Sequence, residues 1–410
     1  MPGGPGSYVL GEDEKKELMD VIDGWYLFRY GSEESAGFKS KVVKFEKEMA
    51  KIHNLKHFIA TSSGTGSLIC CLKALSIGAG DEVIVPGYAF IACVSSIILC
   101  NAMPVLAEVD ESLTLDPTKI EELITPRTKA IMAVHMLGNP CDMNAVTAIA
   151  KKHKLHVIED CCQSVGASYK GERVGNYSDI AAYSLNVFKI ITSGDGGAVG
   201  TNDDMLYERA FGFHDQGHKP ARMGVEVGNR SIVGMNMRMN ELSGAVALAQ
   251  ARKLDNILAT LRAKKAKLKG MLTGLPNFKF RKINDEAGEC ATLLTLIFDT
   301  ADLAERFAEK IGSKPISYSG WHVYNNMEQV LNRVTGTTAN CPYGCPRFPT
   351  QRDYKKHMLP QTDDILSRAI NISIGVVDKG LGAATGININ SEDSEIESMG
   401  AKLAEKIKSL

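Results

Sequence analysis

The sequence predicts an α/β protein with a mostly parallel sheet in a large domain and a smaller α+β domain at the C-terminus. Short apolar runs alternate with helix-like stretches between about residues 55 and 200, and a long helical pattern follows over 239–274. Strand, crossover helix and strand in repetition are typical of a parallel sheet covered by helices on both faces. We therefore divide the chain into a leader with a first helix (1–20), a large domain (21–255) and a small domain (256–410).

The composition is that of a globular protein and excludes several classes of partner. The 410 residues are 44% hydrophobic and 23% charged, with a net charge of -1, so no basic surplus points to nucleic acid. No apolar run reaches the roughly 18 residues that a membrane span needs. Residues 1–6 lack the charged and apolar regions of a signal peptide. We therefore expect a cytoplasmic protein with a flexible leader.

The ten cysteines raise the question of disulfides and metal binding. Cys70-Cys71 and Cys161-Cys162 stand inside apolar runs, where they look like small buried hydrophobic residues that the cytoplasm would keep reduced. Cys341 and Cys345 are one residue too far apart for the usual C-x-x-C pair, and no second pair with ligand spacing follows. We therefore predict no metal site.

The elements of the large domain follow one another in a regular order. Apolar runs predict buried strands at 81–86, 104–107, 129–135 and 156–160, and helical spacing predicts helices at 117–123 and 144–153. Tyr88, His135 and Asp160 fall at the ends of these strands. Because ligands of parallel sheets bind beyond the carboxyl ends of the strands, we expect the functional site there.

The second half of the chain begins with a helix that leaves the large domain. Asn240 is placed to cap this helix over 239–274. Further on, the pattern predicts a strand at 292–298, a helix at 303–311 and an amphipathic terminal helix at 392–410. The irregular stretch 325–350 is rich in Asn, Cys and Pro, and we expect it to form a surface loop that can cover a site.

Two residues of the large domain suggest a particular chemistry. Lys189 ends an apolar stretch and enters the turn Gly194-Asp195-Gly196-Gly197, where a lysine can hold a carbonyl cofactor as a Schiff base. Asp160 lies 29 residues earlier at the end of an apolar strand, where a carboxylate can pair with a protonated pyridine nitrogen. Each residue alone is more often a solvated loop lysine or a helix-capping aspartate. The two together favour pyridoxal phosphate.

Weaker patterns support the same cofactor. The small residues around Gly64 and Thr65 precede a predicted helix, where backbone N–H groups can approach a phosphate, although such clusters usually only cap helices. Tyr88 and Phe90 place aromatic rings at a strand end, where one can stack on a planar ring or pack in the core. Gln163 would lie beside Asp160 and donate to the cofactor's phenolic oxygen, and Ser184 can add a hydroxyl to the phosphate.

The order of these motifs resembles the DegT/DnrJ/EryC1/StrS family of sugar aminotransferases. The typical features stand here as Ser62-Ser63-Gly64-Thr65, Pro86-x-Tyr88-x-Phe90, Glu159-Asp160-x-x-Gln163, Ser184-x-x-x-x-Lys189 and Gly234-x-Asn236-x-Arg238-Met239. The resemblance implies the aspartate-aminotransferase-like fold type I, with pyridoxal 5'-phosphate bound by the large domain. It extends from about residue 10 to residue 260.

The resemblance also implies a role for each matching residue. Lys189 and Asp160 would be catalytic, as the cofactor-holding lysine and the partner of the ring nitrogen. The other cofactor contacts would be Gly64, Thr65, Phe90, Gln163, Ser184 and Asn236. Asn236 matches an asparagine that reaches the phosphate from the neighbouring subunit. We therefore expect a homodimer with shared active sites.

The chain departs from the common pattern of the family in the regions expected to meet the acceptor. Trp321-His322-Val323-Tyr324-Asn325-Asn326 replaces the usual segment of nucleotide-sugar enzymes, and Phe28-Arg29-Tyr30 is atypical. These features look similar to the subgroup that aminates an eight-carbon ulosonic acid (8-amino-8-deoxy-Kdo formation). Arg29 would then bind a carboxylate, or be a surface arginine packed on aromatic rings. His322 and Asn325 would bind sugar hydroxyls.

The leading hypothesis is an aminotransferase of amino sugar biosynthesis, in a lipopolysaccharide or secondary metabolite pathway. It would move an amino group from glutamate or glutamine to a keto- or aldehydo-sugar, possible acceptors being an oxidised ulosonic acid or a nucleotide-linked keto-sugar. Sugar dehydratases of the same fold carry histidine at the position of Lys189, which argues against that activity. A non-catalytic regulator would be expected to lose Lys189 or Asp160, and both are present.

Overall fold

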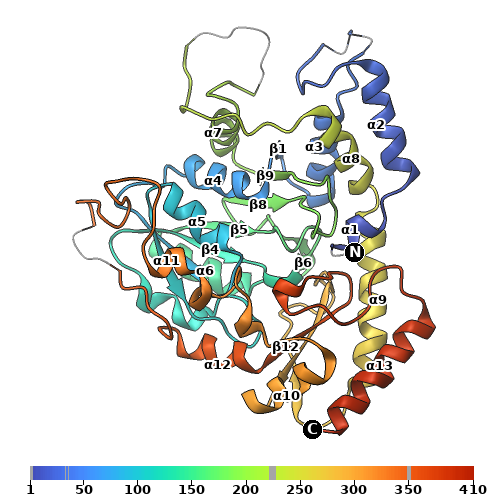
Figure 1. Cartoon of the computed structure of the whole chain (residues 1–410). Helices are drawn as coiled ribbons and strands as arrows, with labels where there is room; N and C mark the ends of the chain where they lie inside the picture. The colour runs from blue at the N-terminus through green and yellow to red at the C-terminus, as the bar shows by residue number, and fades with distance from the viewer. Residues whose placement is uncertain (1–2, 33, 36, 221–227, 349–351) are drawn as a thin grey trace.

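A seven-stranded sheet forms the centre of the computed structural model, which describes residues 3–32, 34–35, 37–220, 228–348 and 352–410 (Figure 1). In spatial order its strands are β1 (His57–Thr61), β9 (Gly197–Thr201), β8 (Ile180–Ser184), β5 (His156–Asp160), β4 (Thr128–Val134), β2 (Glu82–Pro86) and β3 (Met103–Ala107). The strands from β8 to β3 pair in parallel, whereas β9 is antiparallel to both its neighbours. The predicted α/β class with a mostly parallel sheet is confirmed.

The four strands expected from apolar runs are present, and three further strands complete the sheet. The additional strands β1, β8 and β9 include the two that flank the Lys189 loop. Half of the residues of β8 and β9 are Ala or Gly, which have weak strand propensity, and pairing inside the buried sheet decides their conformation.

Helices cover both faces of the sheet, so that strands such as β2 and β3 are buried along their whole length. These helices are α3 (Lys41–His53), α4 (Gly64–Ala74), α5 (Ile91–Leu99), α6 (Met143–His153), α7 (Asp204–His214) and α8 (Glu241–Ala251). The helix expected at 117–123 is instead two 3-10 turns, Pro117–Lys119 and Glu121–Leu123. The chain returns to an extended conformation at Ile124 before a helix can continue.

The long helix expected over 239–274 is two helices, α8 and α9 (Leu254–Leu272), separated by Arg252 and Lys253. Asn240 caps α8 as predicted, because its Oδ1 accepts a hydrogen bond of 3.0 Å from Ser243 N. We call the part from α9 to the C-terminus the small domain. Its antiparallel sheet contains β10 (Phe278–Phe280), β11 (Leu293–Phe298) and β12 (Ala369–Ser373), with helices α10 (Ala301–Ile311), α12 (Pro360–Arg368) and α13 (Asp393–Lys408) around it. The short helix α11 (Glu328–Leu331) lies apart from this sheet, beside the large domain (Figure 1).

The N-terminal segment is not a flexible leader. Within its described part, Gly3–Gly6 are buried, α1 (Pro5–Tyr8) follows, and Gly3 pairs with Val377 of the small domain. The boundary predicted after residue 20 falls inside α2 (Glu12–Gly24), which packs against α8. Residues 1 and 2 lie outside the described part of the chain.

The stretch 325–350 does not cover the carboxyl ends of the strands. Its described part packs at the opposite edge of the sheet, where Phe348 is buried and the Cβ of Arg347 approaches Gly80. Just beyond it, Arg352 pairs with Glu82 at the start of β2, with Nη2 and Oε2 2.8 Å apart. Apolar side chains of this stretch join the core beneath it, which a surface loop would not do. None of the described helices is both long and apolar enough to cross a membrane.

Candidate active site

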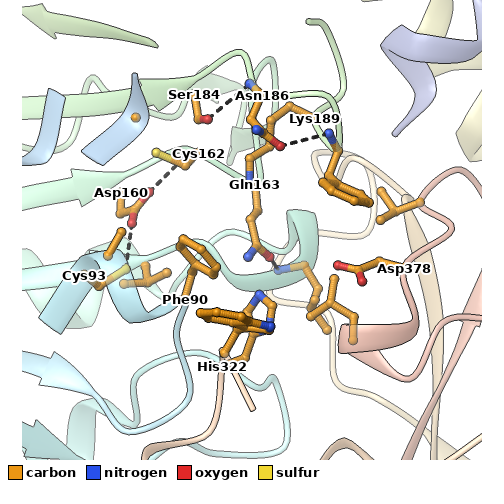
Figure 2. Close-up of a pocket in the computed structure, with 18 of the residues that line it drawn as sticks. Phe90, Cys93, Asp160, Cys162, Gln163, Ser184, Asn186, Lys189, His322 and Asp378 are labelled. Atoms are coloured by element: carbon orange, nitrogen blue, oxygen red, sulfur yellow. Dashed lines mark hydrogen bonds between the residues drawn. The ribbon is translucent and has the colours of Figure 1, made fainter. Parts of the chain in front are cut away.

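A cavity of about 510 Å³ opens at the carboxyl ends of the parallel strands, as the topology predicts (Figure 2). Val134, Asp160 and Ser184 end β4, β5 and β8 and line its floor. The small domain closes the other side with residues that include Thr292 and Asp378. The cavity therefore lies between the two domains, where ligand sites are common.

Eight of the eleven residues predicted to contact cofactor or substrate line this one cavity: Gly64, Thr65, Phe90, Asp160, Gln163, Ser184, Lys189 and His322. They come from separate elements of the large domain and from one segment of the small domain. Asn236, Arg29 and Asn325 are not among the lining residues.

Asp160 is a nearly buried carboxylate, 4% exposed, held by two neutral donors. Its Oδ1 accepts from the backbone N–H of Cys162 at 2.9 Å, and its Oδ2 accepts from the thiol of Cys93 at 2.9 Å. Within the described residues, no Lys, Arg or His side chain forms an ion pair with it. A buried carboxylate of this kind is suited to a cationic ring nitrogen of a ligand.

Three residues behind the cavity fix the strand that carries Asp160. His135, Glu159 and Cys161 are buried and offer metal-ligand atoms within 4.8 Å of one another. However, the ring of His135 lies between Glu159 Oε1 and the backbone N–H of Cys141, at 3.0 Å from each, and Glu159 also accepts from two backbone N–H groups. These bonds anchor β5. His135, although at a strand end as expected, does not reach the cavity.

Lys189 lies in a loop whose following residues, Ile190 and Ile191, are buried and anchor it. Its backbone N–H donates to Asn186 O at 2.9 Å, which closes a tight turn. Figure 2 shows Lys189 and Asp160 at two sides of the cavity, with Gln163 and Phe90 between them. A planar ligand lying on Phe90 would therefore have Lys189 at one side and Asp160 at the other.

The N-terminus of α4 forms a cradle for an anion. Ser63 caps the helix, because its Oγ accepts from Gly66 N at 3.0 Å. A Cβ on Gly64 would lie 2.7 Å from the Cβ of Ser184, so only glycine permits this approach of helix and strand. Backbone N–H groups and a helix dipole directed at a narrow, hydroxyl-bearing space are typical of phosphate sites.

His322 and Phe90 form one wall of the cavity. Their ring centroids are 5.3 Å apart, and His322 Nδ1 lies 3.0 Å from Ser319 Oγ, which fixes the imidazole. Burial, together with the nearby charge of Lys189, lowers the pKa of His322 to about 3. His322 is therefore neutral at physiological pH and can offer a hydrogen bond, not a charge, to a ligand.

Gln163 is oriented by the backbone. Its Oε1 accepts from Leu137 N at 2.9 Å, so the amide NH₂ group remains for the cavity. This orientation is the one needed for the predicted donation to a phenolic oxygen.

Several residues that line the cavity were not predicted from the sequence. Asp378 contributes a carboxylate whose Oδ1 accepts from Gly380 N at 2.8 Å, and Asn186 donates to Asp195 Oδ1 at 2.9 Å. Trp321, 60% exposed, lies at the edge of the cavity. Asp378 follows the apolar run of β12 at a short distance, which is the same pattern that identified Asp160.

The prediction that Arg29 binds a substrate carboxylate is wrong for the cavity of this chain. Arg29 is 2% exposed, and its guanidinium donates to Glu46 at 2.8 Å and to Ala60 O at 3.1 Å. The flanking aromatic ring of Tyr30 lies under it, with the guanidinium carbon 5.0 Å from the ring centroid. Arg29 is therefore a buried structural cation and not a group at the mouth of the site.

Asn325 is also committed elsewhere, in contrast to the prediction. Its amide donates to Asp363 Oδ1 at 2.7 Å and accepts from His357 N at 2.9 Å, which fastens the loop before α12. Asn236 is exposed on the segment that pairs with Asp215, and it does not reach the cavity of its own chain.

The comparisons with known proteins agree with this geometry. Residues 32–377 match the model of the DegT/DnrJ/EryC1/StrS aminotransferase family. The chain belongs to this family. GDP-perosamine synthase of Caulobacter vibrioides is 44% identical over 223 residues, which are 53% of this chain and 58% of that protein. The GDP-perosamine synthase of Vibrio cholerae is 34% identical over 271 residues, or 65% of this chain and 70% of that protein.

Other family members share the sequence or the fold. L-glutamine:2-deoxy-scyllo-inosose aminotransferase of Micromonospora echinospora is 40% identical over 232 residues, which are 55% of each chain. The crystal structure of 3-amino-5-hydroxybenzoic acid synthase covers all of both chains with a TM-score of 0.79 and 25% identity. The aminotransferase from Psychrobacter cryohalolentis gives 0.78 at 25% identity, over 100% of this chain and 99% of that one. The fold is therefore type I, as expected.

The cavity fits pyridoxal phosphate, the cofactor of this family. The buried carboxylate of Asp160 lacks a described basic partner, the helix N-terminus at Gly64 leaves room for a phosphate, and the ring of Phe90 is 39% exposed at the cavity wall. Lys189 would hold the carbonyl carbon of the cofactor. Gln163 would donate to its phenolic oxygen.

Proposed function

We propose that this protein transfers an amino group from glutamate or glutamine to a keto- or aldehydo-sugar, with pyridoxal phosphate as cofactor. The presence of Lys189 and Asp160 in one cavity carries this proposal. The names of the relatives, which include perosamine synthases and inosose aminotransferases, support a sugar-like acceptor. The matched region spans about 58% of the Caulobacter relative, so the activity is inferred from the site itself.

The residues of the cavity have separate tasks in this reaction. When bound, pyridoxal phosphate supplies an electron sink for the carbanion that forms on the amino donor. The Lys189 amine would hold the carbonyl carbon of the cofactor and, when free, would accept and return a proton at the reacting carbon of the donor. The buried Asp160 carboxylate would keep the ring nitrogen protonated. Phe90 would pack against the ring.

The charges of the cavity support a site completed by a second subunit. Its described lining contains the carboxylates of Asp160, Asp195 and Asp378, and Lys189 as its cation. Glutamate carries two carboxylates, which require further positive groups. The exposed Asn236 matches a family position whose asparagine reaches the cofactor phosphate in the site of the neighbouring subunit. We therefore propose a homodimer in which each active site contains residues of both subunits.

A neighbouring cavity supports an acceptor that extends beyond its reacting carbonyl. This second cavity, of about 310 Å³, shares Trp321 and Gly380 with the first and is also lined by Tyr318, Lys314 and Lys379. The Lys314 amine lies 5.0 Å from the centroid of the Tyr318 ring. Aromatic surfaces and two cations suit either a nucleotide-linked keto-sugar or an oxidised ulosonic acid. We rank the nucleotide-linked keto-sugar first, because Arg29, the residue predicted to bind an acceptor carboxylate, is buried and lines neither cavity.

Borohydride reduction tests the proposed chemistry. After incubation with pyridoxal phosphate, reduction should attach a pyridoxyl group to Lys189, as found by peptide mass spectrometry. The variant Lys189→Ala should remain folded and unlabelled. Labelling at another lysine, or a protein that stays colourless with the cofactor, would overturn the proposal.

An acceptor screen tests the substrate. Protein loaded with pyridoxamine phosphate is mixed with nucleotide-linked keto-sugars, keto-inositols and oxidised ulosonic acids, and the return of visible absorption is followed. Substitution of both Lys314 and Lys379 by Met should raise the KM of an anionic acceptor and leave the reaction with the amino donor unchanged. A neutral keto-inositol as the best acceptor would exclude a role for the second cavity.

A further inference from the structure

The N-terminal segment binds both walls of the cavity at once. Gly3 and Val377 exchange two backbone hydrogen bonds, of 3.2 and 2.9 Å. Gly4 N donates to Val187 O at 2.9 Å, and Gly6 N donates to Lys189 O at 3.3 Å. The first pair fastens the segment to the small domain, and the second pair fastens it to the loop that carries Lys189.

The bonded residues adjoin or belong to the lining of the cavity. Val376 and Asp378, on either side of Val377, line it, as does Phe188 next to Val187, and Lys189 both accepts a bond from the segment and lines the cavity. Ser7 adds a bond from its Oγ to Val187 O at 2.6 Å. A displacement of the segment would therefore move groups that face the ligand, although the segment itself is behind the wall.

The contact is close enough to require glycine. A Cβ on Gly4 would lie 2.3 Å from the carbonyl carbon of Phe188 and 2.5 Å from Lys189 O. A Cβ on Gly6 would lie 2.8 Å from Thr192 N. Gly4 has φ of -99°, which any residue adopts, so the space and not the backbone conformation demands glycine there.

We propose that residues 3–7 are positioning residues of the active site, which hold the Lys189 loop and residues 376–378 at a fixed separation. The segment directs the Lys189 amine towards the ligand and sets the distance across the cavity to Asp378. Its effect on catalysis depends on the proposed role of Lys189, whereas its effect on the two walls does not.

The test compares two glycine variants. Gly4→Ala introduces the clash, and Gly11→Ala is the matched control, because no atom lies within 4 Å of a Cβ at Gly11 and its φ of -165° is extended backbone. Hydrogen–deuterium exchange of the apoprotein is measured by mass spectrometry. Peptides spanning 185–191 and 374–379 should exchange at least tenfold faster in Gly4→Ala and at the original rate in Gly11→Ala, while α7 remains protected in both.

A second readout concerns the bound cofactor. In Gly4→Ala the pH dependence of the visible absorption of the Lys189-linked cofactor should shift, and kcat should fall at least tenfold while the KM of the amino donor changes less than threefold. Ser7→Ala, which removes one bond without a clash, should change both readouts in the same direction by about two- to threefold, in line with the loss of one hydrogen bond.

Original exchange rates in both wall peptides of Gly4→Ala would overturn the proposal. If Gly4→Ala also loses the protection of α7, the variant has unfolded, and Ser7→Ala decides: unchanged exchange in that variant would then refute the positioning role. If the wall peptides of Gly4→Ala exchange faster but the original protein does not bind pyridoxal phosphate, the result would support the contact between the N-terminal segment and the walls and would refute the proposed function.

Discussion

Replacement of Arg29 by methionine distinguishes a buried structural cation from a substrate ligand. Arg29 and Glu46 form an ion pair of 2.8 Å, with their side chains 2% and 14% exposed. Removing one member of a buried pair costs about 3–5 kcal/mol, because the other charge remains without its partner. Glu46 Oε1 keeps its hydrogen bond from Ala60 N at 2.7 Å, so we expect the free energy of unfolding to fall by about 3 kcal/mol, at the lower end of this range.

Differential scanning calorimetry of the apoprotein at one fixed scan rate measures this loss. An unfolding entropy of about 2.1 cal/mol/K per residue gives about 0.9 kcal/mol/K for a chain of this length, so a loss of about 3 kcal/mol in Arg29→Met should lower the Tm by about 3–4 °C. Arg306→Met is the control, because Arg306 is 45% exposed and pairs with Asp302 one helical turn away. That change should lower the Tm by no more than about 1 °C.

Two further measurements distinguish a structural role of Arg29 from a role in substrate binding. The double variant Arg29→Met/Glu46→Leu should recover part of the lost stability, because no buried charge is left unpaired. The folded Arg29→Met protein should retain the original KM for the acceptor. A Tm within 1 °C of the original protein together with a strongly raised acceptor KM would refute the structural assignment and return Arg29 to the substrate.

The remaining predictions concern the cavity. Asp160→Asn should lower turnover by orders of magnitude in a steady-state assay, because a neutral ring nitrogen makes a poor electron sink; near-original turnover would reduce Asp160 to a capping residue. Cys93→Ala removes the thiol donor to Asp160 and should weaken pyridoxal phosphate binding by about two- to tenfold in equilibrium titration, whereas Cys93→Ser should keep most of the affinity. Burial lowers the pKa of His322 to about 3 from its ordinary value of 6.5. Between these two pH values only the unfolded chain binds a proton at this residue, so the free energy of unfolding is highest above pH 6.5 and decreases as the pH falls towards 3. His322→Gln should therefore reduce the slope of unfolding free energy against pH in this window by up to about 1.4 kcal/mol per pH unit, and an unchanged slope would contradict a buried neutral imidazole. Finally, mixing inactive Lys189→Ala chains with Asn236→Ala chains should restore some activity through hybrid sites, and no recovery after verified subunit exchange would argue against composite sites.

The chemistry of the site is encoded locally, and the sequence alone identified it. Lys189, Asp160 and Gln163 stand at strand ends or turns whose conformation depends on neighbours a few residues away. Apolar runs and glycine-rich turns are visible in the sequence, and the carboxyl ends of parallel strands meet at one edge whatever the details of packing. For this reason the α/β class and the place of the site could be predicted from the pattern, and most of the eight cavity residues from their match to the motifs of the family.

Contacts between distant segments were decided only by the tertiary structure. Arg29 has the sequence environment of an exposed arginine between aromatic residues, but packing of α3 and β1 buries it against Glu46 and Ala60. The two halves of the predicted long helix separate at Arg252 and Lys253, and β8 and β9 form despite weak propensity. Burial in the assembled core outweighs local preference for Arg29 and for the strands β8 and β9.

The same reason explains why the N-terminal segment looked like a leader. Its Gly and Pro residues have neither helical nor strand periodicity, and local rules therefore predict a flexible chain. Gly4 bonds to Val187 across 183 positions of sequence, and Gly3 bonds to Val377 across 374. Glycine is needed there because of the backbone that approaches it, and that neighbour is brought into place only when the Lys189 loop and the small domain have folded.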